Sequence, residues 1–182
     1  MTSLYHVYII CILIGQYATS DYNLTCPVKS QRRFRNSICT DLARPHYTCL
    51  LDVLDGKNYE SCEDGIPFEA KKGNKKIRRP GITTEKCEET RYQPIPFTTD
   101  EFSECMYRKS LCSEEGQVIA NNGSNGYQDR TCRCDYRAGY TYTVEPRNKC
   151  ECVPSEEDCS CYKKPCSHGE ELSRDYECRE IG

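Results

Sequence analysis

The chain has 182 residues, with 25 basic and 28 acidic side chains and a net charge of −3. This near balance argues against a general nucleic-acid binder. Only 37% of the residues are hydrophobic even when cysteine is counted, tryptophan is absent, and phenylalanine occurs four times. Such a composition excludes a large conventional core, so we expect covalent cross-links to supply much of the stability.

The N-terminal stretch predicts a secretory signal at residues 1–20. Leu4–Ile14 is apolar but too short to span a bilayer comfortably, and Ala18 and Ser20 supply the small residues of a cleavage site before Asp21. Because the stretch contains no lysine or arginine, a retained anchor is the alternative. With the signal cleaved, we expect a secreted, extracellular protein or the ectodomain of a truncated membrane receptor.

Cysteine is the most informative residue, because fifteen of the sixteen cysteines follow the signal. In an oxidising compartment they act as cross-links. An odd number leaves one over, which could be free, could form a disulfide-linked dimer, or could pair beyond Gly182; Cys178, close to the end, suits the last interpretation. We expect the other fourteen in disulfides: Cys26, Cys39, Cys49, Cys62, Cys87, Cys105, Cys112, Cys132, Cys134, Cys150, Cys152, Cys159, Cys161 and Cys166.

Residues 21–86 form the first expected module. Its four cysteines are spaced ten to thirteen residues apart, which suits two bridges, and Tyr47–Val53 is rich in residues that favour strands. A basic loop at 71–79 follows, with Lys71, Lys72, Lys75, Lys76, Arg78 and Arg79. This loop could contact a sulfated glycan, could be a proprotein cleavage site, which Pro80 opposes, or could be a solvated hairpin tip.

Residues 87–178 form the second expected module, and 179–182 form a tail. Gly116–Ala120 and Gly139–Val144 are expected strands, and the Asn-Gly pairs within 121–126 favour tight turns between them. Thr98–Leu111 lacks a sustained helical period. We therefore expect a small disulfide-rich fold, mostly β-hairpins and loops, with elongated cysteine-rich modules after an N-terminal signal helix.

Three Cys-x-Cys pairs, Cys132/Cys134, Cys150/Cys152 and Cys159/Cys161, lie in this second module. Cysteines two apart on an extended chain point to opposite sides, so each member should take a different, distant partner and tie consecutive loops into a ladder. A thiolate metal cluster is disfavoured by the secretory signal and the fourteen tyrosines, and we expect no metal site and no cofactor. Sequons at Asn23 and Asn122 predict N-glycosylation.

The segments Cys87–Tyr92 and Gln128–Tyr140 carry a resemblance to a known family. The second reads Gln-Asp-Arg-Thr-Cys-Arg-Cys-Asp-Tyr-Arg-Ala-Gly-Tyr, and with Cys105 and Cys112 it resembles the cysteine-rich modules of the tumour-necrosis-factor receptor superfamily. The similarity covers about residues 87–178, and the family's mid-module Cys-x-x-Cys step is missing. An epidermal-growth-factor module and an unclassified cysteine-rich fold are the alternatives.

This resemblance implies a rod of stacked loops that presents side chains to an extracellular protein ligand. The ligand-binding residues it implies lie in Arg130–Tyr136 and Arg137–Tyr142, namely Arg130, Arg133, Tyr136, Arg137 and Tyr142. Arginine and tyrosine are over-represented in interface hot spots. The simpler alternative is that tyrosines such as Tyr136 and Tyr140 cover disulfides as a thin core.

An enzyme is not expected. Only His46 and His168 follow the signal, and neither a Gly-x-Ser-x-Gly nor a His-Glu-x-x-His motif occurs. The leading hypothesis is therefore a soluble, decoy or truncated receptor-like binding module with no nucleic-acid partner. The rival is a secreted disulfide-rich effector, such as an inhibitor, toxin-like or defence protein, which binds a sulfated glycan through Lys71–Arg79.

Overall fold

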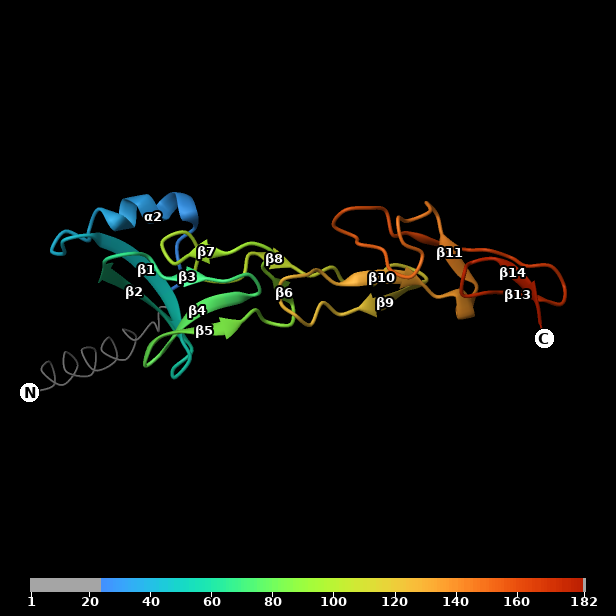
Figure 1. Cartoon of the computed structure of the whole chain (residues 1–182), viewed down its shortest axis with the longest axis horizontal. Coiled ribbons are helices and arrows are strands. Elements are labelled where there is room, and N and C mark those ends of the chain that lie inside the picture. The colour runs from blue at the N-terminus through green and yellow to red at the C-terminus, as the bar shows by residue number, and fades with distance from the viewer. Residues whose placement is uncertain (1–23, 182) are drawn as a thin grey trace, which may run out of the picture.

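The computed structural model describes residues 24–181. The predicted signal at 1–20 and the sequon at Asn23 lie outside the described residues. Within them the chain is mostly strands and loops, with one α-helix and seven disulfides. The molecule is elongated, with a sheet at one end and small hairpins following one another toward the other (Figure 1). The expected small, disulfide-rich β fold is confirmed.

A four-stranded sheet forms the N-terminal end, in the order β2-β1-β4-β5. β1 pairs antiparallel with β2, and β4 pairs antiparallel with β5, whereas β1 and β4 meet in parallel at Asp52 and Arg78. The strands are β1 (Pro45–Asp52), β2 (Lys57–Asp64), β4 (Asn74–Arg79) and β5 (Gly81–Lys86). The run expected at Tyr47–Val53 therefore lies within β1 except for its last residue, and β1 is the most deeply buried strand of the sheet.

Helix α2 (Lys29–Asn36) lies alongside β1 (Figure 1). Cys26 just before it bridges to Cys49, and Cys39 just after it bridges to Cys62, so both ends of the helix are tied to the sheet. The sequence analysis did not predict this helix, because KSQRRFRN lacks an apolar stripe. Its buried residue is Arg32, whose guanidinium lies 5.7 Å from the ring centroid of Tyr47.

Short two-stranded pairs link the two ends of the molecule. They are β3 (Glu69–Ala70) with β7 (Phe97–Thr98), and β6 (Arg91–Tyr92) with β8 (Tyr107–Arg108). Close backbone contacts join the turn at Gly73 to the loop at Gly126: the Gly73 N–H donates to the Gln93 carbonyl (2.8 Å), and the Gln93 N–H donates to the Gly126 carbonyl (2.9 Å). A backbone junction of this kind fixes one half of the rod on the other.

The C-terminal half consists of three hairpins and one short 3₁₀ turn, η1 (Tyr136–Ala138). The paired strands are β9 (Gln117–Asn121) with β10 (Thr131–Cys134), β11 (Tyr140–Tyr142) with β12 (Cys161–Lys163), and β13 (Glu170–Leu172) with β14 (Cys178–Glu180). The core of this half is thin: its buried residues are four cysteines, two tyrosines and Leu172. β9 and β11 lie where the sequence predicted strands.

The disulfides all join cysteines within 27 residues of each other along the chain, although the first two interleave and Cys152–Cys159 lies inside the loop that Cys134–Cys161 closes. They join Cys26–Cys49, Cys39–Cys62, Cys87–Cys105, Cys112–Cys132, Cys134–Cys161, Cys152–Cys159 and Cys166–Cys178. Of the seven, none connects the Cys26–Cys62 region to the C-terminal half. No Cys-x-Cys pair closes on itself, as predicted, but the expectation of a distant partner for every member is wrong, because Cys152 bridges to Cys159 only 7 residues away and Cys150 is free. The bridges fit an extracellular or secreted protein in general terms.

The structure corrects two further expectations. Cys150 was placed among the bridged cysteines, but it is exposed and free, whereas Cys178 is bridged to Cys166. Residues 71–79 were expected as a loop, yet from Asn74 onward they form strand β4. This segment pairs along its length with β5, because alternate side chains, Lys75 and Ile77, are buried beneath the hairpin. Within residues 24–181, no helix has the length and apolar character needed to cross a membrane.

Candidate functional site

Strand β10 and turn η1 place three of the predicted ligand-binding residues together. Cys132 and Cys134 point into the core and are bridged, so Arg133 between them lies on the other side of the strand. The chain then turns at η1, where the Asp135 carboxylate accepts a hydrogen bond from the Arg137 backbone N–H (3.2 Å). The two disulfides thus hold β10 rigidly directly before Tyr136 and Arg137.

These residues line a hollow that we call the arginine pocket. Its volume is about 460 Å³. Residues distant in sequence complete it: Lys149 and Cys150 come from the loop before β12, and Arg174 comes from the turn between β13 and β14. The defining residues are Arg133, Tyr136, Arg137, Lys149, Cys150 and Arg174.

The arginine pocket is strongly positive. Among the described residues no carboxylate lines it, and Arg133, Arg137 and Arg174 form no ion pair; Lys149 alone has one, to Glu145 (3.1 Å). Guanidinium groups that lack a carboxylate in the protein remain free to bind one from a ligand, and arginine does so with two parallel hydrogen bonds. The pocket is therefore suited to an anionic partner.

Tyrosines form the apolar part of the pocket. The guanidinium carbons of Arg133 and Arg137 each lie 5.8 Å from the ring centroid of Tyr136, and the Arg137 Nε donates to its hydroxyl (3.4 Å). This hydrogen bond raises the pKa of Arg137 further. Tyr176 lies beneath, where it donates to the Cys134 carbonyl (3.0 Å), and burial raises the pKa of its hydroxyl. Because Arg133, Arg137 and Arg174 form no ion pair among the described residues, their three guanidinium groups supply the positive charge of the pocket.

Arg130 and Tyr142, also predicted as ligand-binding residues, lie outside the arginine pocket. The Arg130 guanidinium donates to the Asn122 side chain (2.9 Å) and to the Ser110 carbonyl (2.8 Å). Tyr142 is buried in the core, and burial is the main cause that raises its pKa. The Asn122 sequon itself is exposed. Arg130 thus holds a loop in place, and Tyr142 packs the core.

Sequence reasoning missed Lys149, Cys150 and Arg174. Arg174 lies about forty residues after Arg133, and only the folding of the hairpins that carry Cys161 and Cys178 brings it back to β10. No local pattern signals such a contact. For Cys150, the Cys-x-Cys pattern was misleading, because its neighbour Cys152 takes Cys159 and leaves Cys150 without a partner.

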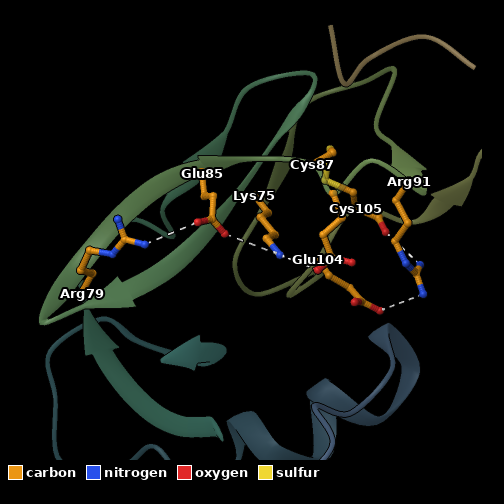
Figure 2. Close-up of polar contacts among 8 residues, drawn as sticks. Lys75, Arg79, Glu85, Cys87, Arg91, Glu104 and Cys105 are labelled. Carbon is orange, nitrogen blue, oxygen red and sulfur yellow. Dashed lines mark hydrogen bonds and ion pairs between the residues drawn. A yellow bond between two sulfur atoms is a disulfide. The ribbon is translucent and has the colours of Figure 1, made fainter. Parts of the chain in front are cut away.

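The basic run at 71–79 is a different surface, and acidic neighbours compensate much of its charge. Lys75 is buried and lies 2.9 Å from Glu88 and 3.8 Å from Glu85, and Arg79 lies 3.6 Å from Glu85 (Figure 2). Arg78 faces Asp52 at 4.0 Å. The run is therefore no continuous positive surface.

Neither a protein-family model nor a curated protein matches the chain.

Proposed function

We propose that the chain is an extracellular protein-binding module with an organisation similar to that of a tumour-necrosis-factor receptor ectodomain. Three features support this: the elongated shape, the disulfides that join only cysteines near in sequence, and the family-like junction Asp129–Tyr140, which contains strand β10 and turn η1 (Figure 1). A rod cross-linked in this way presents its surface with little loss of conformational entropy on binding, which favours affinity.

The arginine pocket is the observation that carries the proposal. Arginine and tyrosine are enriched at interface hot spots, and here the guanidinium groups of Arg133 and Arg137 lie against the Tyr136 ring while Arg174 lines the same pocket. Uncompensated positive charge accelerates association with an acidic surface. The ligand is therefore a protein that inserts an acidic or carboxylate-bearing loop between Arg133, Arg137 and Arg174.

The test is saturable binding of the disulfide-intact chain to a panel of trimeric tumour-necrosis-factor-type ligands, measured by surface plasmon resonance. The double variant Arg133→Glu/Arg137→Glu should weaken binding at least about a hundredfold, because charge reversal at a hot spot costs several kcal/mol. Arg108→Glu is the matched control, since Arg108 is exposed on β8 and outside the pocket. Absence of binding across the panel, or equal losses for pocket and control variants, would contradict the proposal.

The rival function, a secreted effector that uses Lys71–Arg79, receives less support. The carboxylates of Asp52, Glu85 and Glu88 neutralise much of the positive charge that such a surface would present to a glycan.

A further inference from the structure

His46 lacks hydrogen-bond partners although it is buried. Its side chain is 6% exposed, and neither ring nitrogen has a partner. An imidazole always carries at least one N–H donor, and a buried donor without an acceptor costs free energy. The ring packs edge-on to Phe68, at 6.1 Å between centroids, which satisfies its apolar atoms only. Both nitrogens are themselves buried, so His46 forms part of the wall beneath the helix rather than a donor to solvent.

His46 lines a hollow that we call the helix groove, of about 560 Å³, between α2 and the start of β1. Two cationic side chains border it. Arg33 on α2 and Arg44 directly before β1 are both exposed, and within the described range neither guanidinium has a hydrogen-bond or ion-pair partner. Two guanidinium groups that can donate to an oxyanion therefore border the groove without an acceptor.

The acidic residues at the groove do not neutralise these donors. Glu101 is engaged by Lys29 in an ion pair. Asp100 raises the pKa of Arg32, although burial lowers that pKa by more. The remaining positive charge of the groove is thus carried by Arg33 and Arg44.

The walls of the helix groove are held rigidly. Arg32 donates from Nε to the Pro27 carbonyl (3.0 Å) and from Nη1 to the Thr99 carbonyl (2.6 Å), and it also contacts the Ser103 hydroxyl. The bridges at Cys26 and Cys39 tie down both ends of α2. A preformed site binds more tightly because less freedom is lost on binding.

We propose that the helix groove binds a sulfate group of an extracellular sulfated glycan, which the guanidinium groups of Arg33 and Arg44 hold. Clusters of basic residues bind either nucleic acid or heparin-like polyanions. The disulfides place the protein where sulfated glycans, rather than nucleic acids, are the abundant polyanions. α2 also presents Lys29 and Arg33 four residues apart, on one face of the helix, along which a polymer can continue.

The probe is a heparin octasaccharide, titrated by calorimetry into the full disulfide-intact chain, with unsulfated heparosan and inorganic sulfate as separate arms. Arg33→Gln/Arg44→Gln should weaken octasaccharide binding by at least about a hundredfold, since each of the two lost charge-assisted hydrogen bonds is worth about tenfold or more in affinity. Arg35→Gln/Lys76→Gln is the charge-matched control, because Arg35 is paired with Glu60 (3.4 Å) and neither residue lines the groove. It should bind within about twofold of the wild type.

His46→Phe separates binding from folding. The substitution removes no hydrogen bond that the protein makes, and the new ring suits the contact with Phe68. The octasaccharide affinity should therefore stay within about twofold of the wild type, while the melting temperature stays the same or rises. Chemical-shift changes of the Arg33 and Arg44 side chains on adding the octasaccharide would report contact directly.

Four outcomes would overturn the proposal. They are octasaccharide binding that survives Arg33→Gln/Arg44→Gln, equal losses in the control pair, equal affinity for heparosan, and an acidic peptide that displaces the octasaccharide at lower concentration. The arginine pocket lies in the other half of the chain, so the result is independent of the proposed protein-binding function.

Discussion

At the scale of single residues, Asp129 shows how a residue of the family-like junction acts. Its buried carboxylate accepts from the Ser110 backbone N–H (2.8 Å), the Ser110 hydroxyl (2.8 Å) and the Arg130 N–H (2.7 Å). Asp129→Ala leaves two backbone donors unpaired, so we expect it to lower the free energy of unfolding by about 1–3 kcal/mol. Urea unfolding of the oxidised protein measures this. Asp175→Ala, at an exposed ion pair with Arg179, is the control and should change little.

The segment around Asp129 also shows how much of the site can be predicted from the sequence. The pattern around Asp129–Tyr140 correctly indicated a cross-linked, arginine- and tyrosine-bearing surface, because Cys-x-Cys spacing and strand alternation are local properties. Local reasoning could not separate Arg133, which is free, from Arg130, which is engaged by Asn122 and Ser110. Such partners depend on tertiary contacts, and helix α2 was missed for the same reason, since its stability comes from two disulfides and the buried Arg32.

At the scale of elements, the β4–β5 hairpin is tied to the chain after it by the buried Lys75. A hydrogen bond from its Nζ, with its charge, holds the pKa of Glu88 below its usual range. A carboxyl with a depressed folded-state pKa stabilises the protein above its unfolded pKa of about 4.3, and the contribution is lost as the pH falls through the folded-state pKa. The Lys75–Glu88 ion pair should therefore stabilise the protein at neutral pH and contribute no stability in acid.

Glu88→Gln tests this pH dependence. At about pH 6–7 we expect a loss of up to about 1 kcal/mol, because Glu88 is more than half exposed and the pair is screened. At a pH low enough to protonate the wild-type carboxyl in the folded state, both proteins should have the same stability. Urea unfolding across the pH range measures the difference. Glu156→Gln, in an exposed pair with Arg147, is the control, and a pH-independent difference would contradict the prediction.

At the scale of the whole molecule, two glycines hold the halves of the rod together. Gly126 has a φ of +77°, and a Cβ there would lie 2.7 Å from the Gly73 carbonyl oxygen. Gly56 has a similar φ of +71° but open space around it, so Gly56→Ala reports the backbone strain alone, about 1–2 kcal/mol. Gly126→Ala should cost about 1–3 kcal/mol more through steric overlap. It should also increase the radius of gyration in small-angle scattering, whereas equal effects of the two variants would show that the junction is not tightly packed.

The free Cys150 determines whether the protein can form a disulfide-linked dimer. Cys150 is exposed within the arginine pocket, so two chains joined through it would bring Arg133, Arg137 and Arg174 of both copies together. Like charges at such short range repel unless salt screens them. We therefore expect a monomer at low ionic strength with one thiol among residues 24–181, which iodoacetamide labels at Cys150, and faster disulfide-linked dimerisation in air as salt is raised. Non-reducing gels with peptide mapping measure both, with Cys150→Ser as the control. A Cys150-linked dimer that forms as readily at low salt would mean that the pocket's charge is neutralised in solution.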